Sequence, residues 1–88
     1  MKTTIEISKY PLNEAYKIPI KEFIKRLNSH PELKIITSPT NTLITGNYDE
    51  VMSILQDEIK VSFEKYGKVV FVMKVFNGDL LERLEVMR

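Results

Sequence analysis

The chain has 88 residues, of which 43% are hydrophobic and 28% are charged, a balance typical of one soluble globular domain. Thirteen basic and twelve acidic side chains leave a net charge of +1, which argues against a nucleic-acid or anionic-membrane partner. The absence of cysteine excludes disulfides and thiolate metal ligands and favours a cytoplasmic protein. No apolar run approaches a membrane span, and the first residues lack a signal-peptide pattern, so we expect neither insertion nor secretion.

The first predicted element is a strand at residues 2–10, because apolar and polar side chains alternate there with a period of two. Ile5 and Ile7 fall on one face of this strand. The other face carries Glu6, Ser8 and Tyr10. Pro11 has no N–H and is expected to end the ladder. The polar face therefore presents a carboxylate, a hydroxyl and a phenol in a row, which suits recognition of a small polar ring.

Hydrophobic spacing and turn residues predict the next elements. A helix is expected between residues 14 and 29, and its regular part should begin near Ile18, since Pro19 fits only the first turn. Two short strands rich in threonine and isoleucine follow at residues 33–38 and 42–46. They are separated by a short turn.

A second helix is expected to begin after Asn47, which serves as its N-cap with Glu50 three residues later. Gly67 is expected to end it as a left-handed C-cap. The buried stripe of this helix is predicted to comprise Val51, Ile54, Leu55, Ile59, Ser62 and Phe63. The last strand is predicted at residues 68–76.

The order strand, helix, strand, strand, helix, strand predicts a ferredoxin-like α+β sandwich. Its four-stranded antiparallel sheet would carry two helices on one face, with the first and third strands in the centre. We expect residues 1–77 to form a single ligand-binding domain. Residues 78–88 are expected to form a short helix capped by Asp79, or a loose tail.

The last strand is apolar on both faces. One face carries Val69, Phe71, Met73 and Val75, and the other carries Val70, Val72, Lys74 and Phe76. In an isolated two-layer sandwich the second face would meet water and should be polar. Leaving three large apolar side chains wet is unfavourable, so we expect a homodimer or tetramer formed through the open sheet face.

No arrangement of residues indicates catalysis, and we expect that the protein is not an enzyme. His30 is the only histidine. It is expected to be a solvated residue at a helix end, without a serine partner or a metal. Residues 66–72 weakly resemble the aromatic RNA-recognition motif, but they fall on the fourth strand and not the third. An acylphosphatase-like activity would require an arginine near the end of the first strand, and none is present.

Several polar residues have both a structural and a functional interpretation. Glu6 and Lys74 should be cross-strand neighbours, as a weak ion pair or as a polar pair in an oligomer pocket. Tyr10 either anchors the turn at Pro11 or stacks on a flat heterocycle. Tyr16 and Phe76 are weaker candidates for stacking.

Five segments, in this order, carry a resemblance to a known family. They are Glu6-Ile7-Ser8-x-Tyr10-Pro11-Leu12, Tyr16 before Ile20-Lys21-x-Phe23-Ile24, Thr42 followed by Gly46-x-Tyr48-Asp49-x-Val51-Met52, Ser62-Phe63-Glu64, and Gly67-Lys68-Val69-Val70-Phe71-Val72-x-Lys74. In this order and spacing the chain resembles the YkoF-related family of thiamin- and hydroxymethylpyrimidine-binding proteins. The resemblance extends from residue 4 to residue 79. One departure is Thr40-Asn41-Thr42, where family members often have Met-Ser-Thr.

The resemblance implies a non-catalytic role in binding thiamin or its hydroxymethylpyrimidine precursor, in salvage or transport, with no cofactor beyond the ligand. The predicted ligand-binding residues are Glu6, Ser8, Tyr10 and Thr42, followed by Asn41, Ser62 and Lys74. Hydroxyl groups can meet the donors and acceptors of an aminopyrimidine, and a thiazolium cation favours an aromatic face with a nearby carboxylate. The alternative is a ligand-free structural or regulatory homo-oligomer, in which the same polar residues only line an interface.

Overall fold

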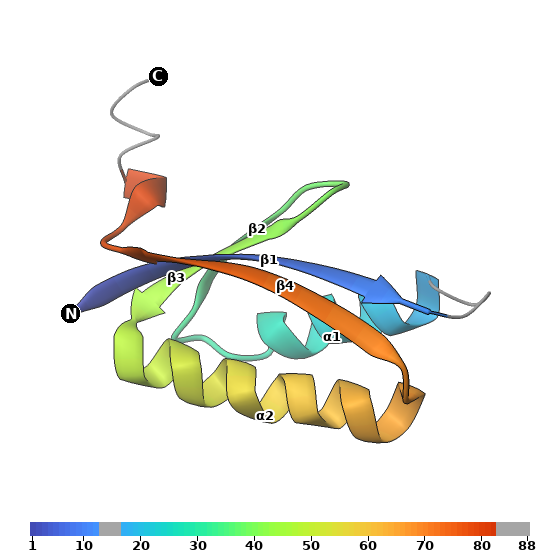
Figure 1. The fold of residues 1–88 in the computed structure, drawn as a ribbon. Coiled ribbons are helices and arrows are strands. Elements are labelled where there is room, and N and C mark those ends of the chain that lie inside the picture. Colours follow the sequence, from blue (N-terminus) through green and yellow to red (C-terminus); the bar gives the residue numbers. More distant parts are fainter. Residues whose placement is uncertain (13–16, 83–88) are drawn as a thin grey trace.

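The computed structural model describes residues 1–12 and 17–82, and its elements follow the predicted order (Figure 1). The strands are β1 (Lys2–Pro11), β2 (Lys34–Thr37), β3 (Thr42–Asn47) and β4 (Val69–Asn77), and the helices are α1 (Lys17–Asn28) and α2 (Tyr48–Tyr66). The strands form one antiparallel sheet in the order β2-β3-β1-β4. Both helices cover the same face of this sheet. The predicted ferredoxin-like α+β fold, with the first and third strands in the centre, is confirmed.

The first strand is one residue longer than predicted. Pro11 was expected to end the ladder, but Pro11 itself still pairs with Val69 of β4. A proline is tolerated at this place because no strand lies along the other edge of β1 there, so no ladder bond requires its missing N–H. The start of α1 at Lys17 agrees with the expected beginning of regular helix, while residues 13–16, including the weaker stacking candidate Tyr16, lie outside the described residues.

The core lies between the sheet and the two helices. Its buried members are Ile5, Ile7, Phe23, Leu27, Ile44, Val51, Ile54 and Leu55. The predicted stripe of α2 is correct for its first half but wrong for Phe63, which is 47% exposed. Residues four apart are rotated by about 40° around a helix, so three such steps from Val51 bring Phe63 to the edge of the core. Its ring still contacts Phe71 there, with ring centroids 5.7 Å apart. Ser62 is buried in its place.

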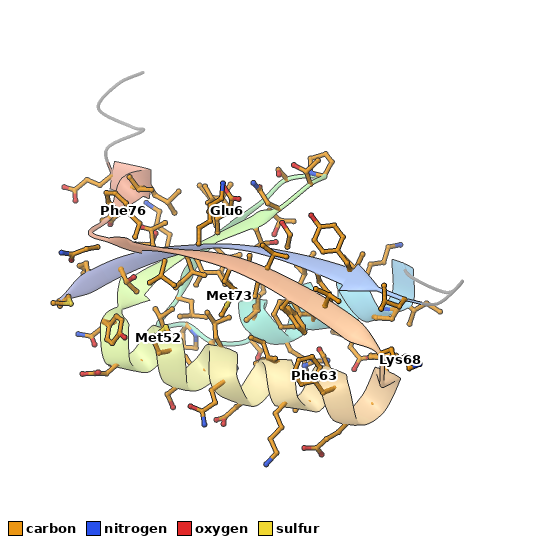
Figure 2. All side chains as sticks on the ribbon, in the orientation of Figure 1. Glu6, Met52, Phe63, Lys68, Met73 and Phe76 are labelled. Atoms are coloured by element: carbon orange, nitrogen blue, oxygen red, sulfur yellow. The ribbon has the colours of Figure 1, made fainter. Side chains whose placement is uncertain are left out.

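The open face of the sheet, which we define as the face without helices, has the predicted composition on β1 and β4. Cross-strand pairs place Glu6 opposite Lys74 and Ser8 opposite Val72. Figure 2 shows Glu6 and Phe76 on the side of the sheet away from the helices. The exposed fractions of Val70 and Val72 are 44% and 51%. An apolar strip on the β4 side of the open face is therefore in contact with water in the single chain.

Residues 78–82 fold onto one end of the open face. A helical turn begins at Leu80, and Asp79 caps it as predicted, because its carboxylate accepts the Glu82 N–H at 2.9 Å. The Thr4 hydroxyl donates to the Gly78 carbonyl at 2.8 Å and accepts the Leu80 N–H at 2.9 Å. Thr4 thus ties residues 78–80 to β1. Within the turn Leu81 is only 1% exposed, so this end of the sheet is not open.

Helix α2 is capped by the two predicted residues, Asn47 and Gly67, but Gly67 does not adopt the predicted left-handed helical conformation. The Asn47 side chain accepts the Asp49 N–H at 3.2 Å. At the other end Gly67 donates its N–H to the Phe63 carbonyl at 3.0 Å and has φ 71° and ψ −112°. This ψ lies outside the left-handed helical region, and a residue with a Cβ is strongly disfavoured there.

We expect Gly67→Ala to lower the free energy of unfolding by about 1 to 3 kcal/mol, because alanine would have to adopt a sparsely populated backbone conformation with positive φ. The cost is purely conformational, since a Cβ at Gly67 would meet no atom within 4 Å. Urea unfolding of the variant and the wild type measures this change in the free energy of unfolding. Gly46→Ala is the matched control, because its Cβ would lie 3.0 Å from the Val51 side chain and so tests crowding without positive φ. A Gly67→Ala protein as stable as the wild type would contradict the assignment.

Candidate functional site

A small cavity opens where β1 continues past the first residue of the antiparallel strand β3. The last pair between these strands is Ile7 with Thr42, but β1 runs on to Pro11 with β4 as its only neighbour. The cavity is bounded by residues 7–9 of β1, the turn at residues 38–42 and one flank of α1. Its volume is about 70 Å³, and it is partly open to solvent.

Three of the predicted ligand-binding residues, Ser8, Asn41 and Thr42, line this cavity together. The turn holds Asn41 in a defined orientation, because the Ser38 hydroxyl donates to its Oδ1 at 2.7 Å and accepts its backbone N–H at 3.2 Å. Among the described residues no acceptor is bonded to the Asn41 Nδ2 group, and none is bonded to the Thr42 hydroxyl. The Ser8 hydroxyl donates to the Thr40 carbonyl at 3.2 Å. Two of the three side chains thus retain free hydrogen-bonding capacity.

The rest of the cavity wall is apolar. Ile20, Phe23 and Ile24 line it from α1, at the spacing of one helix face, and Ile7 and Pro39 complete it. Pockets for small organic ligands typically combine such apolar walls with a few fixed polar groups. An aromatic side chain and branched aliphatic side chains also offer a flat ring a surface to stack on. The arrangement therefore fits a small heteroaromatic ring better than a sugar or a simple anion.

The remaining predicted ligand-binding residues lie elsewhere. Glu6, Tyr10 and Lys74 are on the open face and do not line the cavity. The distance between the Lys74 Nζ and a Glu6 carboxylate oxygen is 3.8 Å, and the lysine is 79% exposed, so this pair contributes little to stability. The seven residues thus do not form one site. Three of them line the cavity, and three others lie on the open face without lining it.

The seventh residue, Ser62, is buried between the two helices. Its hydroxyl accepts hydrogen bonds from Arg26 Nη2 at 2.7 Å and from Lys9 Nζ at 3.2 Å. Because Ser62 is fully buried, it contacts these two cations and not solvent. Its role in this structure is to hold the helices and β1 together.

Lys9 is a site residue that the sequence interpretation missed. It lines the cavity, and its side chain passes between the helices, where Nζ donates to the Pro19 carbonyl at 2.8 Å. The same ammonium lies 5.3 Å from the ring centroids of Phe23 and Tyr66, which favours the cation. Burial, followed by the charge of Arg26, nevertheless lowers the pKa of Lys9 to about 8. The sequence did indicate this orientation, because the alternation in β1 places residue 9 on the same face as Ile5 and Ile7.

A cluster of charged side chains outside the cavity also stabilises the contact between α1 and α2. Arg26 bonds to Glu22 and to Glu58, each at 2.9 Å. The hydrogen bond from Tyr66 and the neighbouring Lys65 ammonium lower the pKa of Glu22 to about 2. His30 was expected to be a solvated residue at a helix end. It is instead paired with Glu58, because its Nε2 lies 2.8 Å from a Glu58 carboxylate oxygen.

The described part of the chain, residues 1–12 and 17–82, contains no cluster of three or more side chains that could ligate a metal. Over the same residues, neither helix combines the length and hydropathy needed to cross a bilayer.

Comparison with known proteins identifies relatives by structure only. No protein-family model matches the chain, and no curated protein matches it in sequence. Protein SP2199 of Streptococcus pneumoniae is 28% identical, with a TM-score of 0.84, over 97% of this chain and 99% of that one. A Thermotoga maritima protein, TM0486, provisionally assigned to thiamine biosynthesis or salvage, is 19% identical with a TM-score of 0.86, and each chain is fully covered. Protein MJ1052 of Methanocaldococcus jannascii is 19% identical with a TM-score of 0.81. These likenesses confirm the fold over essentially the full length of the chain.

The lowered pKa of Lys9 predicts a specific pH dependence of stability. Folded Lys9 has a pKa of about 8 and an ordinary lysine one of about 10.5, so between these values the unfolded chain binds more protons. The contribution of Lys9 to stability therefore rises with pH across this window. We expect the free energy of unfolding of the wild type, relative to Lys9→Met, to increase from pH 8 to pH 10.5.

Chemical unfolding of both proteins at several pH values tests this prediction. Subtracting the free energy of unfolding of Lys9→Met from that of the wild type removes the titration of Lys65 and Tyr66, which both proteins share. Parallel pH profiles for the two proteins would contradict the burial of the Lys9 ammonium.

Proposed function

We propose that this protein is a non-catalytic binding protein for hydroxymethylpyrimidine or thiamin, acting in thiamin salvage or transport in the cytoplasm. The observation that carries the proposal is the convergence of Ser8, Asn41 and Thr42 on one cavity with apolar walls, although β1 and the β2–β3 turn are far apart in sequence. The provisional assignment of the Thermotoga protein supports it, as does the resemblance of the segments around these residues to the YkoF-related family.

The size of the cavity favours the pyrimidine ring as the part that is recognised. A volume of about 70 Å³ corresponds to roughly two water molecules in the liquid. It is far smaller than the roughly 300 Å³ or more of a pocket that encloses a drug-sized ligand. The ring would therefore be only partly enclosed by one chain, and the thiazolium of thiamin would extend outside. Glu6, the carboxylate expected to meet that cation, is on the open face and not in the cavity wall.

Self-association through the open face is the second part of the proposal. Val70, Val72 and Phe76 are exposed along β4 on that face, beside Tyr10 of β1. Covering a large apolar side chain contributes roughly 1.5–3 kcal/mol, so burial of this strip against a second copy is favourable. Ser8, which lines the cavity, lies opposite Val72 of this strip. A second copy would thus help to enclose a ligand that one chain leaves exposed.

The competing function is a ligand-free structural or regulatory homo-oligomer. The exposed strip on β4 supports self-association equally well without a ligand. The two functions differ in one measurable property, because a ligand that binds only the folded protein must raise its unfolding temperature in a saturable way.

We expect Thr42→Val to weaken hydroxymethylpyrimidine binding by about tenfold, because it removes one hydrogen-bonding hydroxyl with almost no change in shape. Thr37→Val is the matched control. Thr37 is the ladder partner of Thr42 on β2 and does not line the cavity, so its variant should bind as the wild type does.

Calorimetric titration with hydroxymethylpyrimidine and, separately, with thiamin measures both affinities. Equal affinities for the two variants would place the site elsewhere. The absence of heat and of a thermal shift with either compound at millimolar concentration would leave the ligand-free oligomer.

We expect Val72→Asp to dissociate the oligomer, because it buries a charge in the proposed interface. Val61→Asp is the matched control, since Val61 is an exposed valine on α2 and far from the open face. Light scattering coupled to gel filtration gives the mass of each protein. A monomeric wild type, or a Val72→Asp protein of unchanged mass, would contradict association through this face.

A further inference from the structure

The cavity exposes an edge of β1 that a strand would otherwise cover. Antiparallel pairing of β1 with β3 ends at Ile7, while pairing with β4 continues from Ser8 to Pro11. The β2–β3 turn does not replace the missing strand. Its contact with this part of β1 is the bond from the Ser8 hydroxyl to the Thr40 carbonyl.

Three backbone bonds establish which main-chain groups of β1 point toward this edge. In an antiparallel strand the N–H and C=O of one residue point to the same side, and successive residues alternate. Leu12 donates to the Lys68 carbonyl and Lys2 accepts from Gly78, so even-numbered residues point toward β4. The carbonyl of Met1 accepts the Tyr48 N–H on the opposite side. Odd-numbered residues therefore point toward β3.

Lys9 is the first odd-numbered residue beyond the last β1–β3 pair. Its N–H and C=O consequently point into the cavity that Lys9 lines, at the place where β3 has diverged. Within the described residues no backbone or side-chain group is bonded to either of them. A partly enclosed backbone donor and acceptor without a partner form a strong recognition site, because pairing them recovers hydrogen bonds that folding has left unmade.

We propose that the main chain of Lys9 recognises the ligand, pairing its C=O and N–H with an amino group and the adjacent ring nitrogen of an aminopyrimidine. This inference rests on the function proposed above and specifies the chemical class that the site selects. A 4-aminopyrimidine carries a donor and an acceptor side by side, which complements the acceptor and donor of one extended residue. The ring takes the place that the residues preceding β3 would occupy if they extended its pairing with β1.

The surrounding side chains suit this pose. The aromatic and aliphatic wall of α1 lies along the cavity, so the plane of a ring can stack there. Asn41 Nδ2 and the Thr42 hydroxyl remain available to hydrogen-bond the second ring nitrogen and the hydroxymethyl group of the ligand. A peptide strand does not fit the same edge, because the volume is about 70 Å³ and the turn is tied to Ser8.

The selectivity of the site follows from the unpaired carbonyl. An analogue of hydroxymethylpyrimidine that lacks the 4-amino group leaves the Lys9 C=O enclosed without a donor. We expect such a desamino analogue to bind at least about tenfold more weakly, because sites built to hydrogen-bond a group strongly reject ligands without it.

The test combines calorimetric titration of both compounds with ¹⁵N–¹H spectra of the labelled full chain. With hydroxymethylpyrimidine we expect the Lys9 amide proton to shift downfield and to exchange more slowly with solvent. The amide of Ile5, which is inside the β1–β3 ladder, is the internal control and should change little.

The outcomes separate this inference from the proposed function. Binding of hydroxymethylpyrimidine with an unperturbed Lys9 amide, or with equal affinity for the desamino analogue, overturns main-chain recognition and leaves the binding function intact. Failure of hydroxymethylpyrimidine to bind at all overturns both. Tight binding of hydroxymethylpyrimidine with a shifted Lys9 amide, and weak binding of the analogue, support the pairing.

Discussion

The different lengths over which β1 pairs with its two neighbours determine the form of the whole molecule. β1 and β4 are paired from Thr3 to Pro11, whereas β1 and β3 separate after Ile7. The long pairing keeps β4 in register, so that its apolar residues alternate between the core and the open face. The early separation leaves a gap in the middle of the sheet. At this gap residues 7–9, the β2–β3 turn and α1 bound a cavity in common.

The cavity is held open by polar bonds and not by packing alone. Ser38 and Asn41 close the turn on itself, and Ser8 holds the turn against β1. On the other side the Lys9 ammonium fixes the first turn of α1 through the Pro19 carbonyl. Each of these bonds lies in the turn between β2 and β3 or in the part of β1 beyond its pairing with β3. The cavity therefore depends on how the elements end, whereas the core depends on their hydrophobic faces.

This difference explains which features could be predicted from the sequence. Alternation in β1 and β4 is a local pattern, so the faces of Ile5, Glu6 and Val72 follow from it directly. The orientation of Thr42 does not, because it depends on the pairing of β3 with β1, which no local pattern specifies. Thr42 faces the helices beside Ile7, on the opposite face from Glu6, and the seven predicted site residues are divided for this reason. Lys9 was missed because a charged residue on a buried face contradicts the usual assignment of lysine to the surface. The turn at Leu80 depends on the Thr4 hydroxyl, a contact between the two ends of the chain that spacing cannot reveal.

The attachment of that C-terminal turn to Thr4 makes the open face asymmetric. Residues 78–81 occupy the end of the open face at Thr4, so a flat protein surface cannot cover the whole face. Any partner on this face is displaced toward the opposite end, where Tyr10, Val70 and Val72 are exposed. Ser8 lies among these residues and also lines the cavity. In the proposed oligomer a partner seated there would contact the cavity wall through Ser8, so the rate at which a small molecule enters or leaves would depend on the lifetime of the contact between subunits.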